Sequence, residues 1–107
     1  MTSFEDRERA EEAKFAHDAD MQFRIQARRN RLLGEWAAER MSLLPAEREA
    51  YAKAVVQADF EEAGDEDVIR KLLGDLTSAG VDVDEAQVRA ALDAKTVEAR
   101  RMLLGEV

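Results

Sequence analysis

The sequence predicts an all-α protein, a small antiparallel four-helix bundle with a mobile, helix-competent N-terminal segment. Three observations favour this class. Apolar residues recur at helical spacing in four successive stretches. The 107 residues include one proline and five glycines, so few positions interrupt a helix. No stretch alternates with the strand period of two, and no repeat of solenoid length recurs.

The N-terminal segment is helix-competent but short of apolar surface. Residues 3–16 are strong helix formers without proline or glycine. Phe4 and Phe15 are their only large apolar side chains, and a short helix without packing is marginal in water. We therefore expect residues 1–18 to be weakly docked or disordered alone, and residues 19–107 to form the bundle.

The first bundle helix is predicted over residues 19–43. A weak break over residues 17–20 is expected before it, with Asp18 as its N-cap. Pro45 ends this helix and starts the next, because proline disfavours a helical residue before it and suits a first helical position. The expected apolar stripe consists of Met21, Ile25, Leu32, Leu33, Trp36, Ala37, Met41 and Leu44.

Three shorter helices are predicted next, over residues 46–62, 66–79 and about 85–104. Gly64 ends the first and Asp65 caps the second, whereas Gly80 closes the second and Asp84 caps the third. Their expected apolar residues are Ala50, Tyr51, Ala54, Val55, Ala58 and the flanking Phe60; Val68, Ile69, Leu72, Leu73 and Leu76; and Val88, Ala91, Leu92, Ala99, Met102 and Leu103.

Gly34 and Trp36 are interpreted as core features of the first bundle helix. A glycine inside a helix costs about 1 kcal/mol relative to alanine, so Gly34 indicates a close approach of another helix. The helix that carries Tyr51 and Val55 is the expected neighbour. Trp36 is expected in the core rather than at an interface.

The charge distribution separates the two regions. Residues 1–31 contain seven acidic and seven basic residues, so the whole net charge of −8 belongs to the later part. This acidic balance argues against broad binding to nucleic acids or anionic membranes. With no cysteine, the chain has no disulfide and no thiolate metal site. It contains no apolar run typical of a signal peptide or a membrane span, so we expect a soluble cytoplasmic protein.

The sequence contains few of the residue types and motifs that catalysis or cofactor binding requires. His17 is the single histidine, and the three serines fall at predicted helix ends, so we expect no enzyme. No glycine-rich phosphate loop is present and no cofactor is required, although weak adenine-nucleotide binding stays open. The acids of residues 59–67 fail as a calcium loop because Arg70 occupies the position of the bidentate glutamate. Acids at a helix start are the better interpretation, and no metal site is expected.

Two further features allow two interpretations each. Arg24, Arg28 and Arg31 share one helix face, which is either a solvated face partly paired with Glu35 or a docking stripe for an acidic protein. His17 lies where the N-terminal segment meets the bundle, and it is either an exposed linker histidine or a pH-sensitive hinge. The second interpretation is open because an ordinary histidine titrates near pH ~6.5.

Four stretches carry a resemblance to a known family. They read TSFEDRERAEEAKFAHD, ARRNRLLGEWAAERM, AYAKAVVQADFEEAGDEDV and RKLLGDL. The chain resembles the ζ subunit, an inhibitor of the F-type ATP synthase in alphaproteobacteria, formerly catalogued as a domain of unknown function. The resemblance covers nearly the whole chain and weakens after about Gly80.

The resemblance implies a regulatory inhibitor. In that family the N-terminal segment becomes helical at a catalytic αβ interface of the ATPase head, meets subunit γ and stops rotation in the hydrolysis direction. The inhibitory residues would then be Phe4, Glu5, Arg7, Arg9, Lys14 and Phe15. The partners would be subunits α, β and γ of the enzyme, with the chain peripheral on the inner-membrane complex and monomeric when free. The alternative from the residues alone is an acidic helical adaptor that binds another protein partner and has no ATPase role.

Overall fold

The computed structural model describes the backbone of residues 3–61 and 64–105 and the side chains of residues 19–59 and 64–105. Within these ranges the chain forms four α-helices and no strand. They are α1 (Ser3–Arg40), α2 (Pro45–Glu61), α3 (Asp65–Ser78) and α4 (Glu85–Leu104). The predicted all-α, four-helix class is confirmed.

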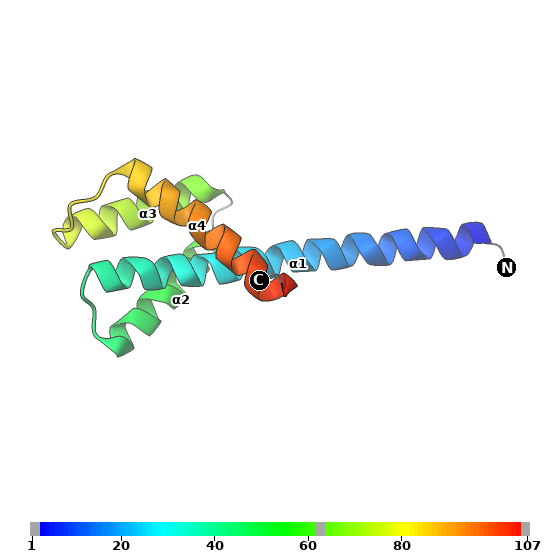
Figure 1. The fold of residues 1–107 in the computed structure, drawn as a ribbon, viewed down its shortest axis with the longest axis horizontal. Coiled ribbons are helices and arrows are strands. Elements are labelled where there is room, and N and C mark those ends of the chain that lie inside the picture. The colour runs from blue at the N-terminus through cyan, green and yellow to red at the C-terminus, as the bar shows by residue number, and fades with distance from the viewer. Residues whose placement is uncertain (1–2, 62–63, 106–107) are drawn as a thin grey trace.

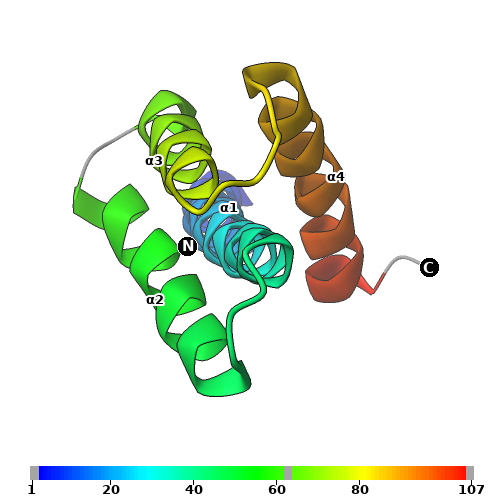
Figure 2. The same ribbon diagram turned by 90° about the vertical axis from the view of Figure 1, so that its left-hand side faces the viewer.

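Helix α1 is the centre of the molecule. Figure 1 shows that successive helices run in opposite directions along the long axis. The view along α1 in Figure 2 shows α2, α3 and α4 arranged around it. These three helices surround only its C-terminal half, and its N-terminal half continues alone away from the bundle (Figure 1). The molecule therefore measures 65 × 27 × 25 Å.

The predicted break before the bundle is wrong. Helix α1 continues through residues 17–20, so Asp18 lies inside a helix and caps none. Residues 3–33 contain neither proline nor glycine, and a run of helix formers therefore continues without a stop. The helix ends at Arg40, before the predicted residue 43.

A turn at Ser42 explains this earlier end. Ser42 has a positive φ of 59°. Its N–H donates to the Glu39 carbonyl at 3.0 Å, and the Leu43 N–H donates to the Ala38 carbonyl at 3.1 Å. This hydrogen-bond pair is a Schellman motif, which satisfies the last carbonyls of a helix.

The core draws on all four helices. Helix α3 contributes the largest share of its buried residues. The buried cluster consists of Leu33, Ala37, Val55, Val68, Ile69, Leu72, Leu76, Val88 and Leu92.

Gly34 marks the closest helix–helix approach, as predicted. A Cβ atom at this position would lie 2.8 Å from the Ala52 Cα and 3.2 Å from Val55 Cγ2. Since no Cβ atom tolerates the first distance, only glycine lets the backbones of α1 and α2 come this close. Trp36, expected in the core, is only partly buried against it. The Arg40 guanidinium covers its ring, 4.7 Å from the centroid.

Four predicted core positions are wrong. Ala50 and Ala54 are exposed, because the contact at Gly34 turns the face of Ala52 inward instead. Leu44 is 67% exposed because α1 ends before it, so it lies in the connection rather than on the stripe. Met102 is 52% exposed in the last turns of α4, which lie beside α1 (Figure 1). The predicted role of Phe60 concerns a side chain outside the described residues.

The predicted signals hold at the end of α3 and the start of α4 and fail in part at the start of α3. Asp84 forms a capping box: its carboxylate accepts from the Gln87 N–H at 2.8 Å, and Gln87 Oε1 accepts from the Asp84 N–H at 2.9 Å. Gly80 follows α3 with φ 83° in the position that favours glycine. The N-cap of α3 is Gly64 rather than Asp65, and it offers no side-chain hydrogen bond.

Candidate partner-binding surfaces

The projecting part of α1 carries the residues that the sequence singled out first. Its backbone is helical from Ser3 onward, so these residues are arranged along one helix that leaves the bundle (Figure 1). The side chains of these residues lie outside the described part of the structure, so the contacts that they make with a partner stay predictions. They are Phe4, Glu5, Arg7, Arg9, Lys14, Phe15 and His17. The continuous backbone at residue 17 removes the expected break, and a pH-sensitive role of His17 stays a prediction.

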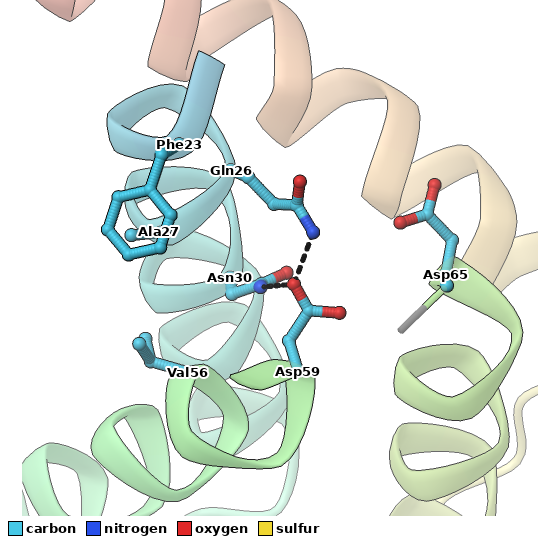
Figure 3. Close-up of a pocket in the computed structure, with 8 residues that line it drawn as sticks. Phe23, Gln26, Ala27, Asn30, Val56, Asp59 and Asp65 are labelled. Carbon is cyan, nitrogen blue, oxygen red and sulfur yellow. Dashed lines mark hydrogen bonds between the residues drawn. The ribbon is translucent and has the colours of Figure 1, made fainter. Parts of the chain in front are cut away.

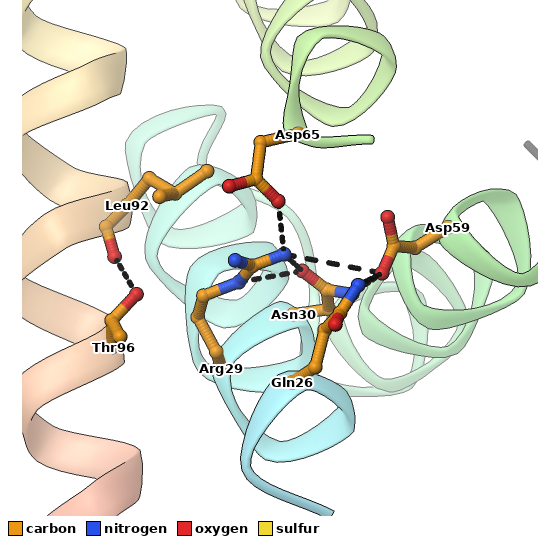
Figure 4. Close-up of polar contacts among 7 residues, drawn as sticks. All are labelled: Gln26, Arg29, Asn30, Asp59, Asp65, Leu92 and Thr96. Carbon is orange, nitrogen blue, oxygen red and sulfur yellow. Dashed lines mark hydrogen bonds and ion pairs between the residues drawn. The ribbon is translucent and has the colours of Figure 1, made fainter. Parts of the chain in front are cut away.

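A buried polar cluster holds the base of this helix. Arg29 and Asn30 of α1 are 7% and 1% exposed. Arg29 Nη2 lies 2.9 Å from the Asp65 carboxylate of α3. Asn30 Nδ2 donates to Asp59 Oδ2 of α2 at 2.8 Å. The Asn30 carbonyl oxygen in turn accepts from Arg29 Nε and Nη2, at 3.1 and 3.0 Å. Figure 4 shows how these contacts join three helices at one point.

Sequence reasoning missed this cluster, although a signal was present. Arg29 lies four residues after Ile25 and four before Leu33, so it shares their inward face. Its guanidinium is buried because acids from two other helices surround it. Asp65 was predicted to cap α3, but its carboxylate pairs with Arg29 instead.

The neighbouring acids also face cations. Asp67 pairs with Arg70 at 3.0 Å, and Glu66 pairs with Arg89 of α4 at 2.7 Å. The hydrogen bond from Arg89 lowers the pKa of the Glu66 carboxyl, and the same contact raises the pKa of Arg89. Among the described side chains no group of three or more acidic or imidazole ligands converges on one point.

A cavity of about 520 Å³ lies beside the polar cluster, between α1, the end of α2 and the start of α3. Figure 3 shows Phe23, Ala27 and Val56 on one side of it and Asp59 and Asp65 on the other. Asp59 Oδ2 accepts from Gln26 and Asn30, whereas its buried Oδ1 has no hydrogen-bond partner. The Asp59 side chain is 7% exposed, whereas that of Asp65, the other acid in the wall, is 48% exposed.

The predicted arginine stripe is partly neutralised. Arg24 pairs with Asp20 at 3.1 Å. Arg31 pairs with the predicted Glu35 at 3.3 Å and with Glu49 of α2 at 2.6 Å. The hydrogen bond to Glu49 raises the pKa of Arg31, and the same bond lowers the pKa of Glu49. Arg28 is exposed, and no ion pair among the described side chains involves it.

These features define a helical protein whose candidate sites are surfaces for a partner. A model of the ATPase inhibitor subunit zeta family matches residues 1–102. The chain belongs to this family of inhibitor subunits, which implies a regulatory role and association with ATP synthase.

A solved structure supports the fold. One solution NMR structure is 48% identical in sequence and superposes with a TM-score of 0.70. The match covers 81% of this chain and 99% of the other. A comparison with curated proteins gives no match. Among the described helices, none combines the length and the apolar character needed to cross a bilayer.

Proposed function

We propose that this chain inhibits ATP hydrolysis by the F-type ATP synthase. Its N-terminal helix would enter a catalytic αβ interface, meet subunit γ and stop rotation. The chain would act from the cytoplasmic side as a peripheral subunit and would need no cofactor. Membership of the inhibitor family supports this role. The resemblance of residues 2–18 to the inhibitory segment of ζ subunits supports the placement of the site.

The projection of α1 is the observation that carries the proposal. The 16 residues from Ser3 to Asp18 span ~24 Å as a helix. Figure 1 shows this part beyond α2, α3 and α4, with none of these three helices beside it. A helix so placed can enter an interface between subunits while the bundle stays outside, because the projecting part is a single helix and is narrower than the bundle.

The mechanism would be mechanical. A helix wedged between subunits must leave before the interface can open, so its contact energy adds to the barrier for rotation. A segment that folds on binding loses about 2–5 kcal/mol of that energy to ordering. A helix that continues from a folded bundle needs less ordering, because the bundle already fixes its C-terminal end. Phe4 and Phe15 would supply the apolar contact. The flanking charged residues would fix the position of the helix along the interface.

The decisive experiment compares ATP hydrolysis by the purified ATPase head with three additions: the full chain, the chain from Asp18 onward, and F4A/F15A. The matched control is L44A/M102A, which removes two exposed apolar side chains from the bundle instead. We expect inhibition by the full chain and the control only. Circular dichroism establishes that every variant is folded.

The outcomes separate the two functions. Full inhibition by the chain from Asp18 onward would contradict the proposal. Absence of inhibition by any folded form, together with failure to co-purify with ATP synthase, would favour the acidic adaptor. The hinge role of His17 has its own test: equal inhibition by H17A and the unmodified chain from pH 6 to pH 8 would remove it.

A further inference from the structure

A second surface, distinct from the projecting helix, lies at its base. It is a groove of about 700 Å³ formed by α1, α2 and the last turn of α4. Its walls carry four cations, Arg24, Arg28, Arg31 and Lys53, and no acidic residue is among the described residues that line it. Between the cations lie apolar side chains, including Phe23, Val56 and Leu103.

This groove stands out because the chain as a whole has a net charge of −8. The acids that pair with its cations lie outside the lining: Asp20 binds Arg24, and Glu35 and Glu49 bind Arg31. Glu49 also reaches Lys53, but only at 3.8 Å, and the Lys53 side chain is 71% exposed. With Arg28 unpaired among the described side chains, the groove keeps a positive excess on an acidic molecule.

The arrangement of the cations indicates the shape of the occupant. Arg24, Arg28 and Arg31 are spaced four and three residues apart, so they extend over ~10 Å of α1. Cations in a row match carboxylates one helical turn apart better than they match a single compact anion. The apolar side chains between them favour an occupant that also has an apolar side.

The position of the groove indicates which protein supplies the occupant. Residues 23–31 of α1 directly follow the projecting part, and Leu103 lies at the end of α4 that rests beside α1 (Figure 1). A protein that encloses the N-terminal helix therefore meets this groove next. We propose that the groove binds an acidic amphipathic segment on the surface of the same ATPase head. This inference rests on the proposed function and adds a second contact to it.

The test uses the full chain and measures its association with the ATPase head by surface plasmon resonance. R28E reverses the unpaired charge in the groove. R70E is the matched control, since Arg70 is 77% exposed on α3, which contributes no residue to the groove. We expect R28E to weaken Kd at least about tenfold, mainly through a slower association rate, and R70E to stay within about twofold. Raising the salt concentration should weaken the unmodified chain more than R28E. K53Q serves as a second groove variant, with a smaller loss expected.

Each outcome has a distinct meaning. If the unmodified chain binds and inhibits while R28E and K53Q bind equally well, the groove proposal is wrong and the proposed function stands. If R28E binds ADP or inorganic phosphate less well but binds the head unchanged, the groove is a small-anion site and the proposal is also overturned. If the unmodified chain does not bind the head, both proposals fail together.

Discussion

The two halves of α1 share one backbone and differ in what holds them. In the C-terminal half, Leu33, Ala37 and Ala38 are fully buried, and three other helices surround them. The N-terminal half is rich in charge and alanine, and no other helix accompanies it (Figure 1). One half is therefore fixed by burial of apolar surface and the other only by helix propensity and by its continuity with the first.

We therefore expect stability and function to depend on different halves of this one helix. Substitutions in the enclosed half act on the free energy of unfolding, because they change packing. Substitutions in the projecting half should leave that free energy almost unchanged and act on inhibition instead. Substitutions in each half test this division.

The strongest test removes a core side chain from the enclosed half. L33A should lower the free energy of unfolding by about 3 kcal/mol, because a fully buried leucine leaves a cavity when truncated. The matched control, L44A, removes the same atoms from a side chain that is 67% exposed and should change stability by less than about 0.5 kcal/mol. Urea denaturation followed by circular dichroism measures both. Equal losses in the two variants would show that burial does not decide stability here.

Two helical glycines should respond to alanine in opposite directions. In G34A the new Cβ would lie 2.8 Å from the Ala52 Cα, so α1 and α2 must separate, and we expect a loss of about 1–2 kcal/mol. In G74A the Cβ meets nothing within 4 Å, so helix propensity should raise stability by up to about 1 kcal/mol. Thermal unfolding gives the signs directly. A more stable G34A would contradict the close approach.

Tyr51 should make the stability of the bundle depend on pH in the alkaline range. Burial raises the pKa of its hydroxyl, and the hydrogen bond that it donates to the Asp75 carboxylate at 2.7 Å raises it further. Its contribution is therefore complete below the ordinary tyrosine pKa of about 10 and is lost as the pH rises above that value. Y51F should cost about 1 kcal/mol at pH 7 and flatten the alkaline decline in stability.

The tyrosine signal can be read without a variant, because the chain contains a single tyrosine. Tyrosinate absorbance of the folded protein should stay low at pH 11 and rise on addition of urea. A full tyrosinate signal in the folded state would contradict the raised pKa.

The smallest expected effect is on the projecting half. F4A/F15A should change the free energy of unfolding by less than about 0.5 kcal/mol, because no other helix packs against this part of α1. Urea denaturation beside L33A gives the comparison within one experiment. A loss similar to that of L33A would mean that the segment docks on the bundle, and the division between the two halves would fail.

Local signals in the sequence identified most of the fold. Pro45, Gly80 and Asp84 act through their own backbone and side-chain chemistry. They therefore predicted the start of α2, the end of α3 and the start of α4 without knowledge of the tertiary structure. Gly34 predicted the close approach to α2 for the same reason. Asp18 had the chemistry of a cap, but its surroundings favour helix on both sides and the cap is not used.

Long-range contacts decided the rest. The burial of Arg29 depends on acids from α2 and α3, which are distant in sequence. Ala52 rather than Ala50 faces inward because Gly34 selects the rotation of α2. The groove likewise needs Lys53 and Leu103 beside the arginines of α1, and no spacing rule along the chain brings these residues together.

The continuity of α1 gives the molecule the properties of a lever. Its 38 residues span ~57 Å. Proline and Gly/Ser pairs, two usual causes of kinks, are missing from its sequence. No interruption of the helical backbone separates the projecting half from the bundle. Any surface that binds the bundle therefore also sets the direction in which α1 leaves it.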